Sequence, residues 1–190
     1  MGRKLAWLVL AALCARADSA FESARRKVVL IEQGLAPAGS RIWFSPEEVN
    51  AYAVQAAAER APQGVRLPQV HLGEGWAVIS AFVDFMKLRE NKGADPAWLA
   101  SRLLAGERPV AASIRLESAA RHATLYVDKL SVSSLVLEGK LLELLVDEFV
   151  ADYLPEIKVG KPFELKHNVE RVEILPAGLY VFIVSQPARP

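Results

Sequence analysis

The stretch from Trp76 to Leu88 reads WAVISAFVDFMKL, and both of its alternating faces are largely apolar. A strand with one wet face alternates apolar and polar residues, because successive side chains point to opposite sides of the sheet. The two sets here are Ala77, Ile79, Ala81, Val83, Phe85 and Trp76, Val78, Ser80, Phe82, Asp84, Met86. The last extended stretch, Leu179 to Val184, is also apolar on both faces. Each of these strands therefore needs a cover on two sides.

Helical periodicity marks the first part of the chain. Residues Phe21 to Gln33 predict a helix with Ala24, Val28 and Ile31 on one face. The consecutive cations from Arg25 to Lys27 indicate a solvated face of that helix; contact with anionic lipid headgroups is the alternative. "GLAPAG" then breaks the chain.

A second helix follows a short extended lead-in, Arg41 to Phe44. Ser45 is predicted to cap it, Pro46 to take its first position and Glu48 to complete a capping box. Two further helices are predicted, from Asp95 to Gly106 and from Glu138 to Pro155, the latter being the longest.

The remaining segments alternate as strands do. Val65 to Leu72 predicts a strand in which Pro68 indicates an edge or a bend, and the turn Gly73 to Gly75 joins it to the strand at Trp76. Further strands are predicted over 109–118 and 121–134, with a bulge near Asp128 and Lys129, and a hairpin turns at 176–178. Because hairpins separate the helices, the order predicts an α+β fold with an antiparallel sheet.

The N-terminus has the layout of a secretory signal peptide. Arg3 and Lys4 precede an apolar run that ends at Leu13, and Ala15-Arg16-Ala17 resembles a cleavage site. We expect a signal peptide over 1–17, with cleavage as late as about residue 20, and one domain over 21–186. An uncleaved anchor and lipidation at Cys14 are the alternatives.

Composition narrows the possible functions. The chain is 52% hydrophobic and 24% charged, so it can form a core, and its net charge of +1 gives no argument for a nucleic-acid partner. Cleavage after Ala17 would leave 23 − 3 = 20 basic against 22 acidic residues and no cysteine. Disulfides and thiolate metal sites would then be excluded.

Motifs of enzymatic chemistry are absent from the sequence. There is no nucleophile elbow, zinc-protease motif, phosphate-binding loop, dinucleotide fingerprint or calcium loop. His71, His122 and His167 are far apart, and none has a second ligand at metal spacing. Asp84 could be a buried site carboxylate, but the charged residues after it indicate that the strand emerges into water there. We therefore predict no enzymatic activity, no cofactor and no metal.

Three arrangements would cover the doubly apolar strands. Helices could sandwich the sheet, a second subunit could pack against it, or the sheet could curl so that its concave face lines an apolar cavity for a lipid or similar ligand.

Several segments resemble the exported bacterial proteins of the LmeA and YpmS type. They are FSPEEVNAY (44–52), LLAGERPVAASIRL (103–116), LYVDKLSVSSLVLEGKLLELLVDEF (125–149) and KPFELKHNVERVEILPAGLYVFIV (161–184). Together the resemblance spans Arg41 to Val184. It implies a TULIP-like tubular lipid-binding fold, in which a curved antiparallel sheet wraps on a long helix and leaves an apolar groove.

The same resemblance implies a function. The chain would be a non-catalytic protein of the periplasm or the extracytoplasmic face of the cell envelope, which binds and transfers phospholipid or another apolar ligand and touches membranes transiently. Candidate groove-lining residues are Trp76, Val78, Phe82, Met86, Tyr180 and Phe182. The alternative is a structural or assembly module that buries an apolar sheet face against a partner or a second copy of itself.

Overall fold

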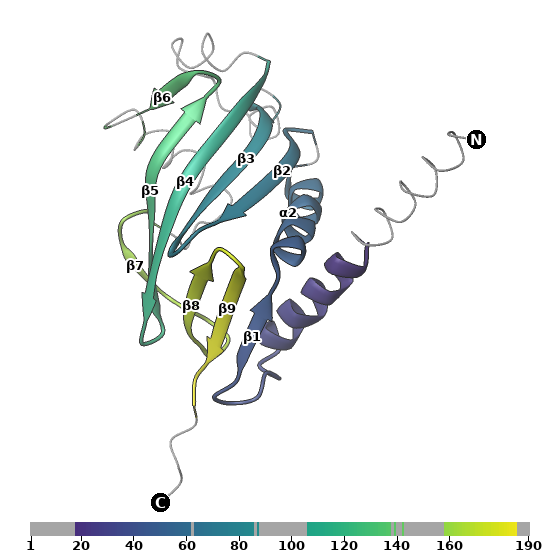
Figure 1. Cartoon of the computed structure of the whole chain (residues 1–190), viewed down its shortest axis with the longest axis vertical. Helices are drawn as coiled ribbons and strands as arrows, with labels where there is room; N and C mark the ends of the chain where they lie inside the picture. Colours follow the sequence, from purple (N-terminus) through teal and green to yellow (C-terminus); the bar gives the residue numbers. More distant parts are fainter. Residues whose placement is uncertain are drawn as a thin grey trace, which may run out of the picture.

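The computed structural model describes residues 18–61, 63–85, 87, 106–137, 139, 142 and 158–185 (Figure 1). A helix over residues 18–32, here called the N-terminal helix, opens the described chain. The elements that follow are β1 (Arg41–Phe44), α2 (Pro46–Arg60), β2 (Val65–Leu72), β3 (Trp76–Asp84), β4 (Glu107–Ala119), β5 (His122–Val132), β6 (Leu135–Leu137), β7 (Pro162–Glu164), β8 (Val169–Leu175) and β9 (Gly178–Ile183).

The strands form two antiparallel sheets. The large sheet has six strands in the order β2-β3-β4-β5-β6, with β7 paired to β5, and the small sheet has three in the order β1-β9-β8. The α+β class and the antiparallel pairing predicted from the sequence are confirmed. The single sheet that was expected is instead divided in two. Of the helices predicted over 95–106 and 138–155, only residues 106, 139 and 142 are described, so both helices and the wrap on a long helix stay predictions.

Local signals explain where α2 begins. Ser45 is extended (φ −71°, ψ 161°), and its side chain accepts a hydrogen bond from the Glu48 N–H at 3.3 Å. The Glu48 carboxylate accepts in return from the Ser45 N–H at 2.8 Å, and Pro46 opens the helix. This capping box satisfies two donors that a helix start leaves without partners. The prediction for this helix start is confirmed.

The strand irregularities also follow the sequence. β2 is an edge strand, and its register with β3 shifts between Arg66 and Gln69, on either side of Pro68. Ser113 pairs with Lys129 and Ile114 with Val127, which leaves Asp128 as the extra residue of a bulge in β5. β3 ends at Asp84, where the carboxylate accepts from the Lys87 N–H, so the strand is shorter than the predicted stretch. The pattern did not predict β6.

Asn50 on α2 closes part of the exposed edge of β2. Its side-chain oxygen accepts from the Val70 N–H at 2.8 Å, and its side-chain nitrogen donates to the Val70 carbonyl at 2.9 Å. The carboxamide thus makes the two bonds that a further strand would make. Such cover keeps an edge strand from pairing with another chain.

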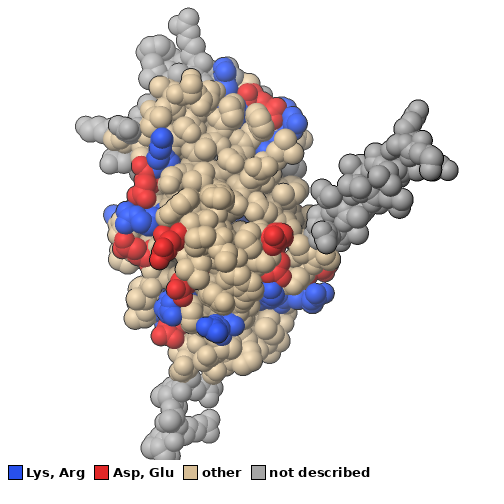
Figure 2. Space-filling model, viewed as in Figure 1, with Lys and Arg blue, Asp and Glu red and all other residues tan. Residues whose placement is uncertain are grey.

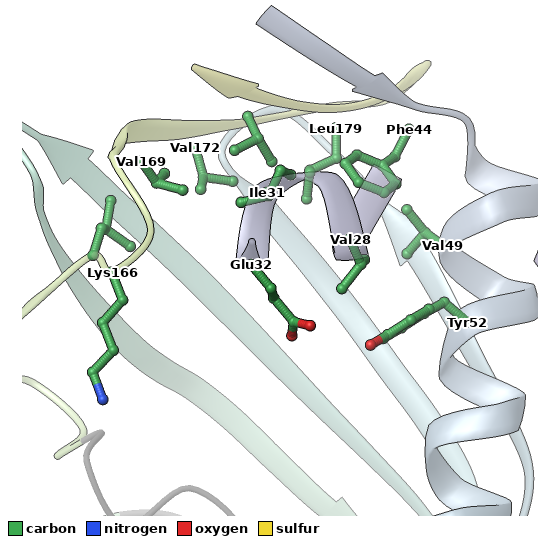
Figure 3. Close-up of a pocket in the computed structure, with 12 residues that line it drawn as sticks. Val28, Ile31, Glu32, Phe44, Val49, Tyr52, Lys166, Val169, Val172 and Leu179 are labelled. Carbon is green, nitrogen blue, oxygen red and sulfur yellow. The ribbon is translucent and has the colours of Figure 1, made fainter. Parts of the chain in front are cut away.

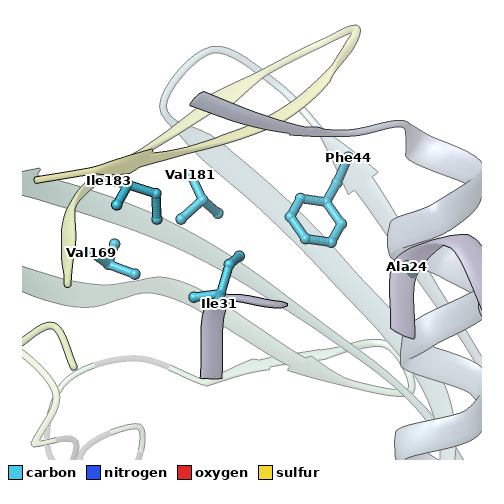
Figure 4. Packing of buried hydrophobic residues seen from close by; sticks show 6 residues of the cluster. All are labelled: Ala24, Ile31, Phe44, Val169, Val181 and Ile183. Atoms are coloured by element: carbon cyan, nitrogen blue, oxygen red, sulfur yellow. The ribbon is translucent and has the colours of Figure 1, made fainter. Parts of the chain in front are cut away.

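The core consists of several modest clusters rather than one large centre. The main cluster joins the N-terminal helix to the small sheet and contains Ala24, Ile31, Phe44, Val169, Val181 and Ile183 (Figure 4). A second lies where the small sheet meets the large one, around Leu72, Ala77 and Ile174, and a third surrounds Phe85, Val132 and Leu137. No large side chain among the described residues is fully buried.

Charged side chains lie mainly toward the rim of the face seen in Figure 2. Lys, Arg, Asp and Glu gather along the edges, those of one edge over β5, and uncharged side chains occupy the middle of this face over β3 and β4. Three large apolar side chains of β3 keep substantial exposure: Trp76 is 37% exposed, Ile79 39% and Phe82 41%. Neither face of this strand is fully covered, because Ile79 lies on one side and the two aromatic residues on the other.

Candidate functional site: an apolar cavity beside the small sheet

A part-buried ion pair fixes the N-terminal helix to the rest of the fold. Lys27 Nζ donates to both carboxylate oxygens of Glu48 at 2.6 Å and to the Trp43 carbonyl at 2.7 Å. The side chain of Lys27 is 29% exposed and that of Glu48 is 10% exposed. The expectation that Arg25 to Lys27 form one solvated face is therefore wrong for Lys27, which turns inward, while Arg25 and Arg26 are exposed.

The environment of Glu48 holds it in the charged form. Burial alone would raise its pKa, but hydrogen bonds from Lys27, Ser23 and the Ser45 N–H, together with the Lys27 charge, lower the pKa below its ordinary value of 4.5. A single carboxylate thus caps α2 and also binds the N-terminal helix. These contacts of Glu48 hold the N-terminal helix and α2 together.

A cavity of about 390 Å³ lies between the N-terminal helix, α2 and the small sheet (Figure 3). Its walls are almost entirely apolar. The lining residues are Val28, Ile31, Glu32, Phe44, Val49, Tyr52, Leu165, Lys166, Val169, Val172, Leu179 and Val181. Branched aliphatic residues dominate, and they come from five separate segments of the chain. The cavity therefore exists only because the fold brings these segments together.

Polar groups are confined to the margin of the cavity. Figure 3 shows the Glu32 carboxylate and the Tyr52 ring on the side away from the small sheet, while the Lys166 amine points away from the apolar walls. A smaller cleft of about 190 Å³ adjoins this side and shares Val28, Glu32 and Tyr52 with the cavity. Its remaining walls include Arg25, Gln55, Glu59 and Arg60. An apolar chamber thus continues into a polar cleft between the two helices.

The two faces of the small sheet carry different residues: one faces the cavity and the other faces away from it. We call its inner face the one that carries Ile42, Phe44, Val172, Ile174, Leu179 and Val181, and its outer face the one that carries Arg41, Trp43, Arg171, Glu173, Tyr180 and Phe182. The inner face supplies walls of the cavity. Tyr180 and Phe182, two of the sequence-predicted groove residues, lie on the outer face.

The candidates on β3 also lie on the side opposite the core. Ala77 is paired with Leu72 and Ile114 within the second cluster, so its face of β3 is the one directed to the core. Trp76, Val78 and Phe82 alternate with it and occupy the other face. None of these three lines the cavity. Met86, the last candidate, lies outside the described residues.

Sequence reasoning missed the residues that do line the cavity, although their signals were present. Val28 and Ile31 were placed on the buried face of the first helix, and Val49 and Tyr52 belong to the apolar stripe of α2. What periodicity does not reveal is that these two stripes diverge enough to leave space between them.

The polar residues considered for chemistry lie apart. His71 is beside Trp76, with ring centroids 6.0 Å apart, His122 Nδ1 is 3.0 Å from the Ala120 carbonyl, and His167 occupies a turn with φ 57°. Within the described ranges, no three His, Cys, Asp or Glu side chains gather closely enough to hold a metal ion.

Among the helices in the described part of the chain, none is both long and apolar enough to span a membrane. Comparison with protein-family models, with curated proteins and with solved structures gave no match.

Proposed function

We propose that this chain binds an apolar molecule, such as an acyl chain of a phospholipid, in the cavity beside the small sheet, without catalysis. The single observation that carries the proposal is the apolar lining of this open chamber. Its volume of about 390 Å³ lies near the lower end of the ~300–1,000 Å³ typical of small-molecule sites. One acyl chain, or one part of a larger lipid, suits that volume.

The energetics favour such a ligand over a polar one. Apolar burial contributes roughly 25 cal/mol per Å², so a hydrocarbon chain gains affinity along its whole length without specific polar contacts. A polar molecule would lose its hydration against these walls, since polar groups are found only at the margin. The margin and the adjoining cleft offer Glu32, Arg25 and Arg60 to the polar end of an amphipathic ligand.

We further propose that the protein works in the cell envelope after export and transfers the bound ligand. The basic start, the apolar run to Leu13 and the small residues at 15–17 support this part of the proposal. N-terminal sequencing of the protein from a periplasmic extract tests it. A mature chain that begins near Asp18 supports export, whereas a chain that keeps its first residues in the cytoplasm contradicts it.

The binding experiment uses a fluorescent fatty acid and two matched variants. Val28 lines the cavity, and Val28→Phe fills part of it, whereas Val54 is 50% exposed on α2 and Val54→Phe adds the same ring to the surface. We expect Val28→Phe to weaken binding of the probe about tenfold or more, because the ring occupies the space of several methylene groups. Val54→Phe should bind as the wild type does.

Equal affinity in all three proteins would place the probe outside the cavity and contradict the proposal. Thermal unfolding of each variant controls for misfolding, since overpacking a full core is itself destabilising.

A structural or assembly module is the second candidate function. The exposure of Trp76, Ile79 and Phe82 on β3 favours it, because aromatic and aliphatic side chains left accessible on a sheet are typical of contact surfaces. Such a module would bind no ligand. A protein that carries no lipid after purification and takes up no fatty acid would favour this second function.

A further inference from the structure

The outer face of the small sheet carries an ordered array of aromatic rings and guanidinium groups. Cross-strand pairing arranges it in two rows: Arg41, Phe182 and Arg171 form one, and Trp43, Tyr180 and Glu173 form the other. The Arg171 guanidinium lies 3.5 Å from the Phe182 ring centroid, and that of Arg41 lies 5.5 Å from the Tyr180 centroid. The proposed ligand cavity, on the other face of the same strands, makes no use of these residues.

The aromatic side chains of the array are held in place because they pack closely on one another and on the strand. The rings of Trp43 and Tyr180 have centroids 4.4 Å apart. A methyl group added at Gly178 would come within 2.5 Å of the Trp43 ring, so only glycine lets the indole lie this close to the strand. The three rings are tilted against one another, by 46° between Trp43 and Tyr180 and by 51° between Tyr180 and Phe182, and they pack closely along the sheet.

This packing restricts what the face can bind. Stacking of nucleic-acid bases requires aromatic rings with an open face. Here guanidinium groups or neighbouring rings already cover Phe182 and Tyr180. Insertion into a membrane requires side chains that project from the surface, and these rings are half-buried. A surface rich in Trp, Tyr and Arg is instead typical of the energetic centre of a protein–protein interface.

We propose that the outer face of the small sheet binds the same face of a second copy of this chain, in a two-fold dimer. A half-turn about an axis that crosses the strands between the two rows places each row over the other. Arg171 then faces Glu173 of the second copy, Phe182 faces Tyr180, and Arg41 faces Trp43. No like charges face each other across the axis, and the Arg171–Glu173 ion pair, which each chain makes within itself at 3.2 Å, can also form between the two copies. An isologous interface requires this kind of self-complementarity.

The size of the face sets the strength of the dimer. The three strands lie about 4.8 Å apart and are four, six and seven residues long, so the face covers ~200–300 Å². Standard interfaces bury ~800 Å² per partner, so the dimer should be weak and should form only at high protein concentration. The proposal does not depend on ligand binding, and the experiment below needs no lipid.

The test exchanges charges and follows the mass of the purified protein by analytical ultracentrifugation over a concentration series. Glu173→Arg sets two guanidinium groups against each other at each symmetric contact, and Arg171→Glu sets two carboxylates against each other. Each single variant should weaken the dimer by more than about tenfold. The double variant with both exchanges restores opposite charges across the axis, so it should dimerise as the wild type does.

A mixture of the two single variants sharpens the test, because each supplies the charge that the other needs. We expect the mixture to form a heterodimer although each component alone stays monomeric. The side chains of Arg171 and Glu173 are 40% and 42% exposed, so both variants should fold, and thermal unfolding checks this.

A wild type that stays monomeric at the highest soluble concentration would overturn the proposal. So would a dimer that both single variants leave intact, since that dimer would use another surface.

Discussion

The two faces of the small sheet show that apolar positions can serve two different purposes in one strand. On the inner face, aliphatic side chains and Phe44 pack on the N-terminal helix and line a cavity. On the outer face, aromatic rings pack on one another and under arginines. β9 is apolar on both sides, but only its inner side is covered by an element outside the small sheet, the N-terminal helix. The outer side is covered within the sheet itself.

The comparison teaches that residue type separates the two faces where hydrophobicity does not. Val181 and Ile183 are nearly buried, whereas Tyr180 and Phe182 are half-buried and contact guanidinium groups. Arginine covers aromatic rings well, because its flat guanidinium stacks on them and remains hydrated at its edges. In β9, the aromatic residues that alternate with aliphatic residues therefore mark the side that arginines cover.

The largest expected effect comes from removing the inner aromatic ring. Phe44 is 7% exposed within the main cluster, so Phe44→Ala should lower the free energy of unfolding by about 3 kcal/mol. Phe182→Ala on the outer face should cost only about 1 kcal/mol, because its ring is partly solvated. Urea unfolding of both variants measures the difference. Equal losses would show that the two faces contribute alike to stability.

The next largest effect concerns the ion pair between Lys27 and Glu48, which holds the N-terminal helix. Lys27→Met leaves the carboxylate of Glu48 without its cation, and we expect a loss of about 2 kcal/mol, below the ~3–5 kcal/mol of a fully buried pair because Lys27 is partly exposed. The outer counterpart is the exposed pair of Arg171 and Glu173, and Glu173→Gln should cost under about 0.5 kcal/mol. Chemical unfolding at neutral pH provides both values.

The same ion pair predicts how the stability of the protein depends on pH. The folded state lowers the pKa of Glu48 below 4.5, so its contribution is present above pH 4.5 and is lost as pH falls through the folded-state pKa. The Glu48→Gln variant should lack this part of the acid-induced decline. Unfolding titrations of wild type and variant at a series of pH values below 5 test this. Parallel declines would show that Glu48 does not contribute.

A small effect is expected for the guanidinium that covers Phe182. Arg171→Gln removes a cation–π contact on the partly exposed outer face and should lower stability by about 0.5–1 kcal/mol. Arg171→Lys keeps the charge but not the flat stacking group, so it should recover only part of the loss. Thermal unfolding of the two variants would resolve this order, and identical midpoints for wild type and both variants would contradict it.

Local signals in the sequence were sufficient for much of the fold. Ser45, Pro46 and Glu48 predicted the start of α2, Pro68 the irregular edge strand, and Asp128 the bulge, since each acts on its own backbone neighbourhood. Lys27 was misplaced because its partner is 21 residues away. The division into two sheets and the cavity were not predicted for the same reason, since they depend on contacts between distant segments.

The groove residues illustrate this limit most clearly. On β3 and β9 the sequence offered two apolar sets, and Trp76, Val78, Phe82, Tyr180 and Phe182 were chosen from the set that the structure places away from the cavity. Nothing in the alternation itself tells inside from outside when both sets are apolar. The packing of Ala77 and Val181 against the core clusters supplies that information.

The central claim is that the cavity beside the small sheet holds an apolar ligand, and native mass spectrometry of the protein purified from a bacterial periplasm tests it most directly. The account predicts an added mass that organic extraction releases as a lipid, and a smaller bound fraction in Val28→Phe than in Val54→Phe. A ligand-free protein that also takes up no added phospholipid or fatty acid would contradict it.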